Sequence, residues 1–280
     1  MSTSTRPAIH HLGHGPRQRG TRFDLGRALL ACGLLYAVLY PVANDAIAAT
    51  AYEGYDRMSQ AVSELSATGA PTRTFLMVLA PVFVLLQVGF GVGIWRAADG
   101  RRSVRIAGAL MVAHGVTSLL WIVAPMSRRE VIAAGGSTSA DTMHLVLAAA
   151  TGLFVAAYVA VLAFGFGWRF RVYSALTLAT ALVFGSLSAQ VERIEAGDPT
   201  PWMGLLERVG MGAWLLWMVV VAVVLLRRDR ARDEVAAAEV SARSHSARPR
   251  PSGPRLTGRR AARSRAARRV SVSRTRVPSR

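Results

Sequence analysis

Six apolar runs of roughly 20 residues each constrain this chain more than any other feature of its sequence. A run of that length crosses about 30 Å of hydrocarbon when it is helical. Proline, glycine or charged residues separate one run from the next. The sequence therefore predicts an all-α membrane protein, a bundle of six transmembrane helices over residues 27–226. The expected spans are 27–49, 74–95, 104–124, 142–166, 173–189 and 203–226.

Arginine placement predicts how the bundle is oriented. Segment 1–26, the turns at 96–105 and 169–171, and segment 227–280 are rich in arginine, whereas the loops between them are acidic or mixed. Short arginine-rich loops stay in the cytoplasm. Both termini are therefore expected on the cytoplasmic side of the plasma membrane. The lack of lysine and the abundance of Ala, Val and Arg suggest a GC-rich bacterial genome.

The C-terminal segment 227–280 differs in character from the rest of the chain. It carries 17 arginines and four acidic residues, and so most of the formal charge of +18. Up to about Ser241 its composition favours a short helix. Beyond that point, and in segment 1–26, polar composition without an apolar period predicts disorder. The tail arginines are expected to bind anionic lipid head groups, but without interleaved aromatic residues no specific nucleic-acid binding is expected.

Ionisable residues gather at the predicted extracytoplasmic ends of the helices, while the cytoplasmic halves contain almost none. An ionisable group inside hydrocarbon costs at least about 2.5–3.5 kcal/mol, so each one requires a partner or a function. This asymmetry predicts a polar pocket on the extracytoplasmic side. The candidate pocket residues are Asp45, Glu64, Glu192, Arg193 and Arg208, with His114 nearer the middle of the third run.

Two residue pairs and His114 leave more than one interpretation open. Asp141 and His144 are three residues apart and share a helix face. That pair suits acid–base chemistry or metal ligation, or else Asp141 caps the helix. Glu207 and Arg208 each require a partner on another helix, and their candidates are Arg193, Asp45, Asp141 and His144. His114 is either a ligand or proton relay, or a neutral side chain hydrogen-bonded to a neighbouring helix.

The segment from Tyr55 to Leu65, YDRMSQAVSEL, resembles a bacterial membrane family catalogued as domain of unknown function 998. The resemblance covers about residues 27–226 and implies six helices with no assigned activity. Members place an acid shortly after the proline that follows the third helix, where this chain has Met126-Ser127. Further likeness comes from Gly69-Ala70-Pro71, Pro125, Asp141 with His144, and Gly204-Leu205-Leu206-Glu207-Arg208.

The leading hypothesis is a multi-pass membrane protein of unknown activity whose extracytoplasmic pocket binds a lipid or another small ligand. The alternative is a membrane-embedded hydrolase, with or without a metal. In outline it resembles the ceramidase-like membrane hydrolases, which need three membrane histidines where this chain offers two. A transporter is the second alternative, disfavoured because no paired halves are evident. No pattern specifies a cofactor, a reaction or an oligomeric state. The candidate catalytic residues are Ser63, Asp141, His144 and Glu207, and the candidate metal ligands are His114 and His144.

Overall fold

The computed structural model describes residues 24–246, and every structural statement below concerns that part of the chain. It contains six helices long and apolar enough to cross a membrane, as the sequence predicted. Large apolar side chains such as Val78, Leu85 and Leu153 are more than two thirds exposed on the sides of these helices. Such a surface is suited to hydrocarbon rather than water.

The first span is built from three helical segments in direct succession. They are α1 (Leu25–Leu39), the π-helical segment η1 (Tyr40–Ile47) and α2 (Ala48–Thr50). Asp24 caps the start of α1, accepting hydrogen bonds from the backbone N–H groups of Gly26 and Arg27. Pro41 lies at the start of η1 and has no N–H to donate, which favours the change of helical pitch at that point.

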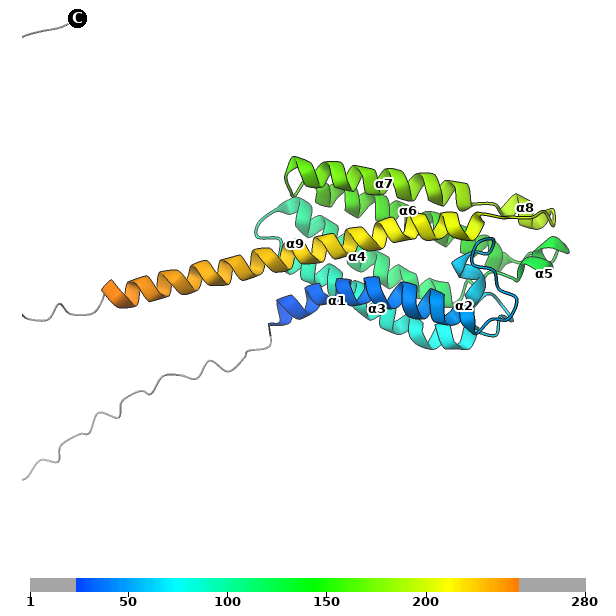
Figure 1. Ribbon diagram of the computed structural model, residues 1–280, viewed down its shortest axis with the longest axis horizontal. Helices are drawn as coiled ribbons and strands as arrows, with labels where there is room; N and C mark the ends of the chain where they lie inside the picture. The colour runs from blue at the N-terminus through cyan, green and yellow to red at the C-terminus, as the bar shows by residue number, and fades with distance from the viewer. Residues whose placement is uncertain (1–23, 247–280) are drawn as a thin grey trace, which may run out of the picture. The chain divides into compact units, whose positions relative to one another are not determined.

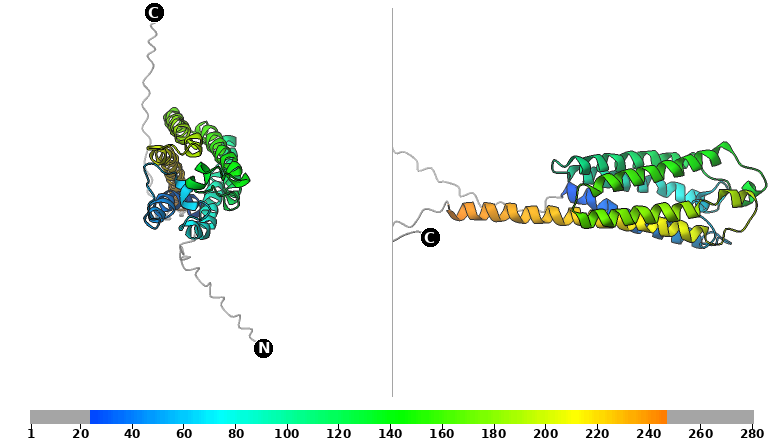
Figure 2. Two further views of the ribbon diagram at one scale, coloured as in Figure 1. Left: turned by 90° about the vertical axis from the view of Figure 1, so that its right-hand side faces the viewer. Right: turned by 90° about the horizontal axis from the view of Figure 1, so that it is seen from above.

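The other spans are single long helices, except that the third ends in a short 3-10 segment. Viewed end on, the long helices of the unit that ends at Glu234 form a ring (Figure 2), in the order α1, α3, α4, α6, α7 and α9. These spans comprise α3 (Arg73–Arg96), α4 (Arg102–Thr117) with η3 (Ser118–Ile122), α6 (Ser139–Ala163), α7 (Trp168–Ser188) and α9 (Met203–Ser246).

Glycines allow α3 to approach both of its neighbours closely. A Cβ atom at Gly93 would lie 2.9 Å from the backbone of α1 at Leu29, and one at Gly91 would lie 2.9 Å from the carbonyl oxygen of Gly108 on α4. Small residues at such positions are the usual means of close helix packing in membranes. The interior of the ring is filled by large side chains, of which Trp217, Tyr158 and Phe90 are fully buried.

Most of the connecting structure lies at one end of the bundle, which we call the loop-bearing end (Figure 1). It contains α2, α5 (Arg129–Ala133), α8 (Val191–Glu195) and residues 51–72, which include the 3-10 helix η2 (Val62–Ser66). We call residues 51–72 the cap segment. The turns at the opposite end are short, between α3 and α4 and between α6 and α7.

Helix α9 continues without a break to Ser246, somewhat beyond the short helix expected up to Ser241. The compact unit that holds the bundle ends at Glu234, and residues 235–246 continue the helix as part of the second unit. Disorder was predicted for residues 1–26 and beyond Ser241, and most of these residues lie outside the described ones. Within the described residues, 25–26 begin α1 and 242–246 belong to α9.

Candidate functional site

The buried carboxylate of Asp45 is the centre of a charged cluster at the loop-bearing end. It lies in η1 and is 4% exposed. Arg208 of α9 binds both of its oxygens, with Nη2 2.7 Å from Oδ1 and Nε 3.0 Å from Oδ2. Arg57 of the cap segment donates to Oδ2 at 2.7 Å. One carboxylate thus joins the first span, the last span and the cap segment.

Arg208 uses its remaining N–H groups to hold the cap segment. Its Nη1 donates to the carbonyl oxygens of Arg57 and Gln60, at 2.8 and 3.1 Å, and its Nη2 donates to the Tyr55 hydroxyl at 2.8 Å. That hydroxyl in turn donates to the carbonyl oxygen of Ala61 at 2.8 Å. Burial raises the pKa of Tyr55 above its usual range, so the hydroxyl remains protonated and able to donate.

The start of α9 docks directly on the cap segment. The backbone N–H groups of Gly204 and Leu205 donate to the carbonyl oxygen of Met58, at 2.9 and 3.1 Å. A helix start leaves such N–H groups without partners inside the helix, and here the cap segment supplies one. Glu207, one turn further on, accepts a hydrogen bond from the backbone N–H of Val62 at 2.6 Å.

A second charged pair joins the cap segment to α5. Arg129 binds both oxygens of the buried Glu64 carboxylate, at 2.7 and 2.8 Å. Glu64 also accepts hydrogen bonds from the Gln60 side chain at 3.0 Å and from the backbone N–H of Ala61 at 2.9 Å. The hydrogen bonds to Glu64 raise the pKa of the Arg129 guanidinium above the usual value. Both oxygens of the Glu64 carboxylate are therefore hydrogen-bonded to groups of the protein itself.

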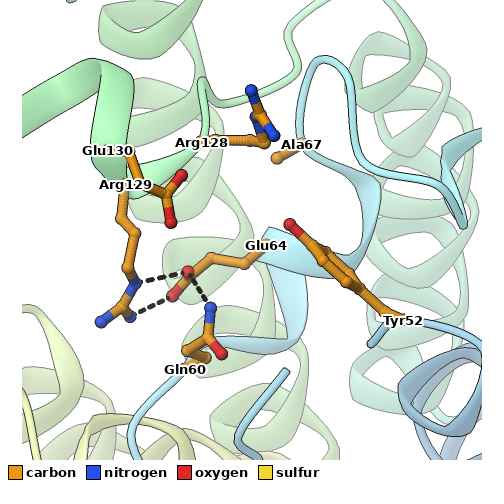
Figure 3. A pocket seen from close by; sticks show the side chains of 7 residues that line it. All are labelled: Tyr52, Gln60, Glu64, Ala67, Arg128, Arg129 and Glu130. Carbon is orange, nitrogen blue, oxygen red and sulfur yellow. Dashed lines mark hydrogen bonds and ion pairs between the residues drawn. The ribbon is translucent and has the colours of Figure 1, made fainter. Parts of the chain in front are cut away.

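A small hollow opens beside this pair (Figure 3). Arg128 and Glu130 stand on its rim, and both side chains are exposed. Within the described residues neither side chain makes a hydrogen bond or ion pair. The hollow is too tight to admit a water molecule below its rim. Its lining consists of Tyr52, Gln60, Glu64, Ala67, Arg128, Arg129 and Glu130.

Asp141 lies in the first turn of α6 and accepts four hydrogen bonds. They come from the backbone N–H and hydroxyl of Thr138, both at 2.8 Å, and from the backbone N–H and hydroxyl of Ser127, at 2.5 and 2.9 Å. The hydrogen bond from the backbone N–H of Thr138 to Asp141 is the one that the third helical residue makes in a capping box at a helix start. Asp141 therefore ties the start of α6 to the segment that precedes α5.

The two membrane histidines occupy separate places. His144 is buried, with Nδ1 3.0 Å from the carbonyl oxygen of Ala124 and its ring against Trp121. His114 lies inside the ring of helices, and its Nδ1 is 2.7 Å from Nε2 of Gln87. No hydrogen bond joins either histidine to Asp141 or Glu207 in the described part of the chain. Across residues 24–246 no group of three or more His, Cys, Asp or Glu side chains is arranged to hold a metal ion.

The remaining candidate residues lie apart from these clusters. The Ser63 hydroxyl is 3.2 Å from the sulfur of Met126. Glu192 and Arg193 are exposed on α8, where Arg193 donates to the carbonyl oxygen of Pro199 at 3.0 Å. The structure thus brings Asp45 together with Arg208, and Glu64 together with Arg129. It leaves Ser63, Glu192 and Arg193 outside both pairs.

A family model described as "Protein of unknown function (DUF998)" matches residues 29–224. The chain belongs to this family. A search of curated proteins and a search of solved structures gave no match. The match spans all six transmembrane helices. In this DUF998 member, the segment from Tyr55 to Leu65 forms half of the cap segment, and Gly204 to Arg208 forms the part of α9 that receives it.

Several residues that build the site did not emerge as candidates from the sequence. Arg129 and Arg57 lie in polar loops, where an unpartnered, solvated arginine is the ordinary expectation. Tyr55 and Gln60 stand in the segment that resembled the family, which is the one sequence signal that pointed to them. Gln87 lies in an apolar run, and its polarity at mid-span was a signal that it faces a partner.

Proposed function

We propose that this multi-pass membrane protein is a binding protein, and that its ligand is a zwitterionic polar group recognised by the exposed side chains of Arg128 and Glu130 at the rim of the hollow. Unpaired Arg128 and Glu130 carry this proposal, because they stand on the same rim with opposite charges. A guanidinium recognises phosphate or carboxylate, and a carboxylate recognises an ammonium group. Glu64 and Arg129 already bind each other and form the base of the hollow beside these rim residues.

The source of such a group is a phospholipid head group or a soluble zwitterion of the same chemistry. Phosphatidylethanolamine carries a phosphate and an ammonium group, whereas phosphatidylglycerol carries only the phosphate. A rim with one free cation and one free anion favours the first over the second. A contact between solvent-exposed charges contributes up to about 1 kcal/mol, so the loss of either rim residue corresponds to an affinity weaker by roughly fivefold or less.

Binding is tested with full-length protein in lipid nanodiscs of phosphatidylcholine, titrated with phosphatidylethanolamine or phosphatidylglycerol and read by native mass spectrometry. Glycerophosphoethanolamine in the buffer tests the soluble source. We expect preferential retention of the ethanolamine form, weakened by Arg128→Ala and by Glu130→Ala but not by the matched control Arg193→Ala. Equal retention of both lipids, or equal effects of all three substitutions, would contradict the proposal.

We further propose that the loop-bearing end faces out of the cell and that both termini lie in the cytoplasm, in the plasma membrane of a bacterium. The distribution of arginine among the loops supports this orientation. The only cysteine, Cys32, allows a direct test after its replacement by alanine. A cysteine introduced at Gly54 should react with a membrane-impermeant maleimide on intact cells, whereas one at Gly100 should react only after lysis. The reverse pattern would invert the orientation.

Neither alternative function is favoured by the geometry. A hydrolase needs its nucleophile and base within hydrogen-bond reach, and the Ser63 hydroxyl contacts the sulfur of Met126. Asp141 is committed to the start of α6. A transporter needs a polar route through the whole bundle. The half of the ring remote from the loop-bearing end is instead lined by buried apolar residues, including Val104, Leu162, Val221 and Leu225.

A further inference from the structure

A separate group of polar side chains lies inside the ring of helices, far from the rim residues. Gln87 of α3 and His114 of α4 are both buried and are 2.7 Å apart. The rings of Tyr158 on α6 and Trp214 on α9 lie 6.0 and 6.3 Å from the His114 ring, centre to centre. His114 is about 18 Å along α4 at 1.5 Å per residue, which places the group near the middle of the hydrocarbon.

Two donors in this group lack a partner. The Tyr158 hydroxyl and Nε1 of Trp214 are buried without a hydrogen bond among the described residues, and Tyr158 is 0% exposed. Trp214 lies beside the Tyr158 hydroxyl, but the geometry falls short of a hydrogen bond. A buried polar group left unpaired costs roughly 1–3 kcal/mol, so native proteins rarely leave two of them together.

The next tryptophan on the same helix shows how such a donor is otherwise satisfied. Nε1 of Trp217 donates to the Ser174 hydroxyl at 3.1 Å, and both residues are buried. The helix ring therefore supplies an internal acceptor for one tryptophan and none for the other. Trp217 is a natural control for Trp214.

The hydrogen bond between Gln87 and His114 determines which nitrogen of the His114 ring carries the proton. Nε2 of Gln87 donates to Nδ1 of His114, so the neutral ring carries its proton on Nε2. That nitrogen makes no hydrogen bond within residues 24–246. An indole can only donate, and the Tyr158 hydroxyl also has a proton to donate. Three donors thus lie in this group, and none of them makes a hydrogen bond to an acceptor within the described residues.

We propose that the centre of the helix ring is a binding site for a neutral oxygen acceptor, held by Tyr158, Trp214 and His114. A trapped water provides such an oxygen, and so does the carbonyl or hydroxyl group of a small neutral molecule. A charged ligand is excluded because nothing there would compensate for its desolvation. This site is distinct from the charged rim and does not depend on the function proposed above.

A row of aromatic side chains lies between the site and the loop-bearing end. Tyr36 packs against Trp214 with ring centres 5.7 Å apart, and Tyr40 stacks on Tyr36 at 5.7 Å. Tyr40 belongs to η1, the segment that also carries Asp45. Toward the opposite end the buried core is formed by apolar residues such as Val104 and Leu225. The polar group therefore lies between the charged cluster and the apolar half of the ring.

Radiolytic hydroxyl labelling of full-length protein in nanodiscs, in buffer enriched in H₂¹⁸O, tests for trapped water at this site. Side chains that touch such water are oxidised although they are shielded from bulk solvent. We expect Trp214 and Tyr158 to be oxidised several-fold faster than Trp217, and Tyr158→Phe to reduce labelling of Trp214 to the level of Trp217. A Trp217→Phe variant should leave labelling of Trp214 unchanged, which controls for altered packing.

Extraction of the same protein with organic solvent, followed by mass spectrometry, tests for the other source of oxygen. A small neutral molecule released from the wild type at near-stoichiometric amount, and lost from Tyr158→Phe, identifies a bound ligand that keeps the three donors from being labelled. Labelling without a released molecule identifies water. If Trp214 is labelled no faster than Trp217 and no molecule is released, the proposal is overturned.

Discussion

Arg208 and Asp45 lie 163 positions apart in the chain, yet they form a two-bonded ion pair with distances of 2.7 and 3.0 Å. The pair closes the ring between its first and last spans and at the same time holds the cap segment through Arg57. Both side chains are largely shielded from solvent, with 14% and 5% exposed. A charge pair in such a place is far more costly to break than one on a water-exposed surface.

Arg208→Gln should lower the free energy of unfolding by about 3 kcal/mol, because it leaves the buried Asp45 carboxylate with only Arg57 as a charged partner. Denaturant titration of the purified protein measures the change. Adding Asp45→Asn to Arg208→Gln should restore part of the loss, since the uncompensated charge is then removed. The exposed control Arg193→Gln should change little, and an equal loss in that control would refute a special role for the pair.

Gly204→Ala should detach the cap segment from α9. A Cβ atom at this position would lie 2.1 Å from the carbonyl oxygen of Gln60 and 2.5 Å from that of Arg57. Faster amide hydrogen exchange in the cap segment, measured by mass spectrometry, should report the change. Gly212→Ala on the same helix has nothing within 4 Å of its Cβ, so it should stabilise α9 by up to about 1 kcal/mol. Identical exchange in the two variants would contradict the docking described above.

Asp141→Asn should weaken the start of α6 by about 1 kcal/mol, because an amide cannot accept all four hydrogen bonds that the carboxylate accepts. Exchange at the backbone N–H groups of Ser127 and Thr138 should accelerate while ligand binding at the rim is retained. If the variant were as stable as wild type, a purely structural role for Asp141 would be untenable.

Asp56, an exposed residue of the cap segment, should give the loop-bearing end a dependence on acid pH. Hydrogen bonds from the Ser59 hydroxyl and the backbone N–H of Met58 lower the pKa of Asp56. A carboxyl group whose pKa is lower in the folded state stabilises it above the unfolded value, near about pH 4. That contribution is lost as pH falls through the folded pKa. Carbon-13 NMR titration of labelled aspartate should show the Asp56 pKa rising in Ser59→Ala, and an unchanged pKa would argue against this cause.

The spans were predictable because hydropathy is a local property of the chain, and all six appear where the apolar runs occur. Helix capping by Asp141 was also open to sequence analysis, since its partner Thr138 lies three positions away. The pairing of Glu64 with Arg129 was not, because the partners are 65 positions apart and only the packing of α5 on the cap segment brings them together. Local pattern therefore predicts the helices, whereas the charged contacts depend on the tertiary arrangement.

Tyr158 and Trp214 illustrate a further limit of sequence analysis. Aromatic residues within apolar runs are ordinarily packing residues, and nothing in their spacing distinguishes Trp214 from Trp217. The difference emerges only when hydrogen-bond partners are assigned, because Ser174 of α7 faces one indole and not the other. The sequence signal that did point to this region was the isolated histidine at position 114.

The central claim is that the polar residues of the loop-bearing end fold residues 51–72 into a rigid cap on the bundle. Amide hydrogen exchange of the wild-type protein in nanodiscs tests it most directly, at the backbone N–H groups of Ala61, Val62, Gly204 and Leu205. The structure predicts exchange nearly as slow as in the transmembrane helices, because the N–H of Ala61 is bonded to Glu64 within the cap segment and the other three donors form hydrogen bonds between the cap segment and α9. Exchange at the rate of an unstructured peptide would show that the cap segment is not docked and would contradict the account.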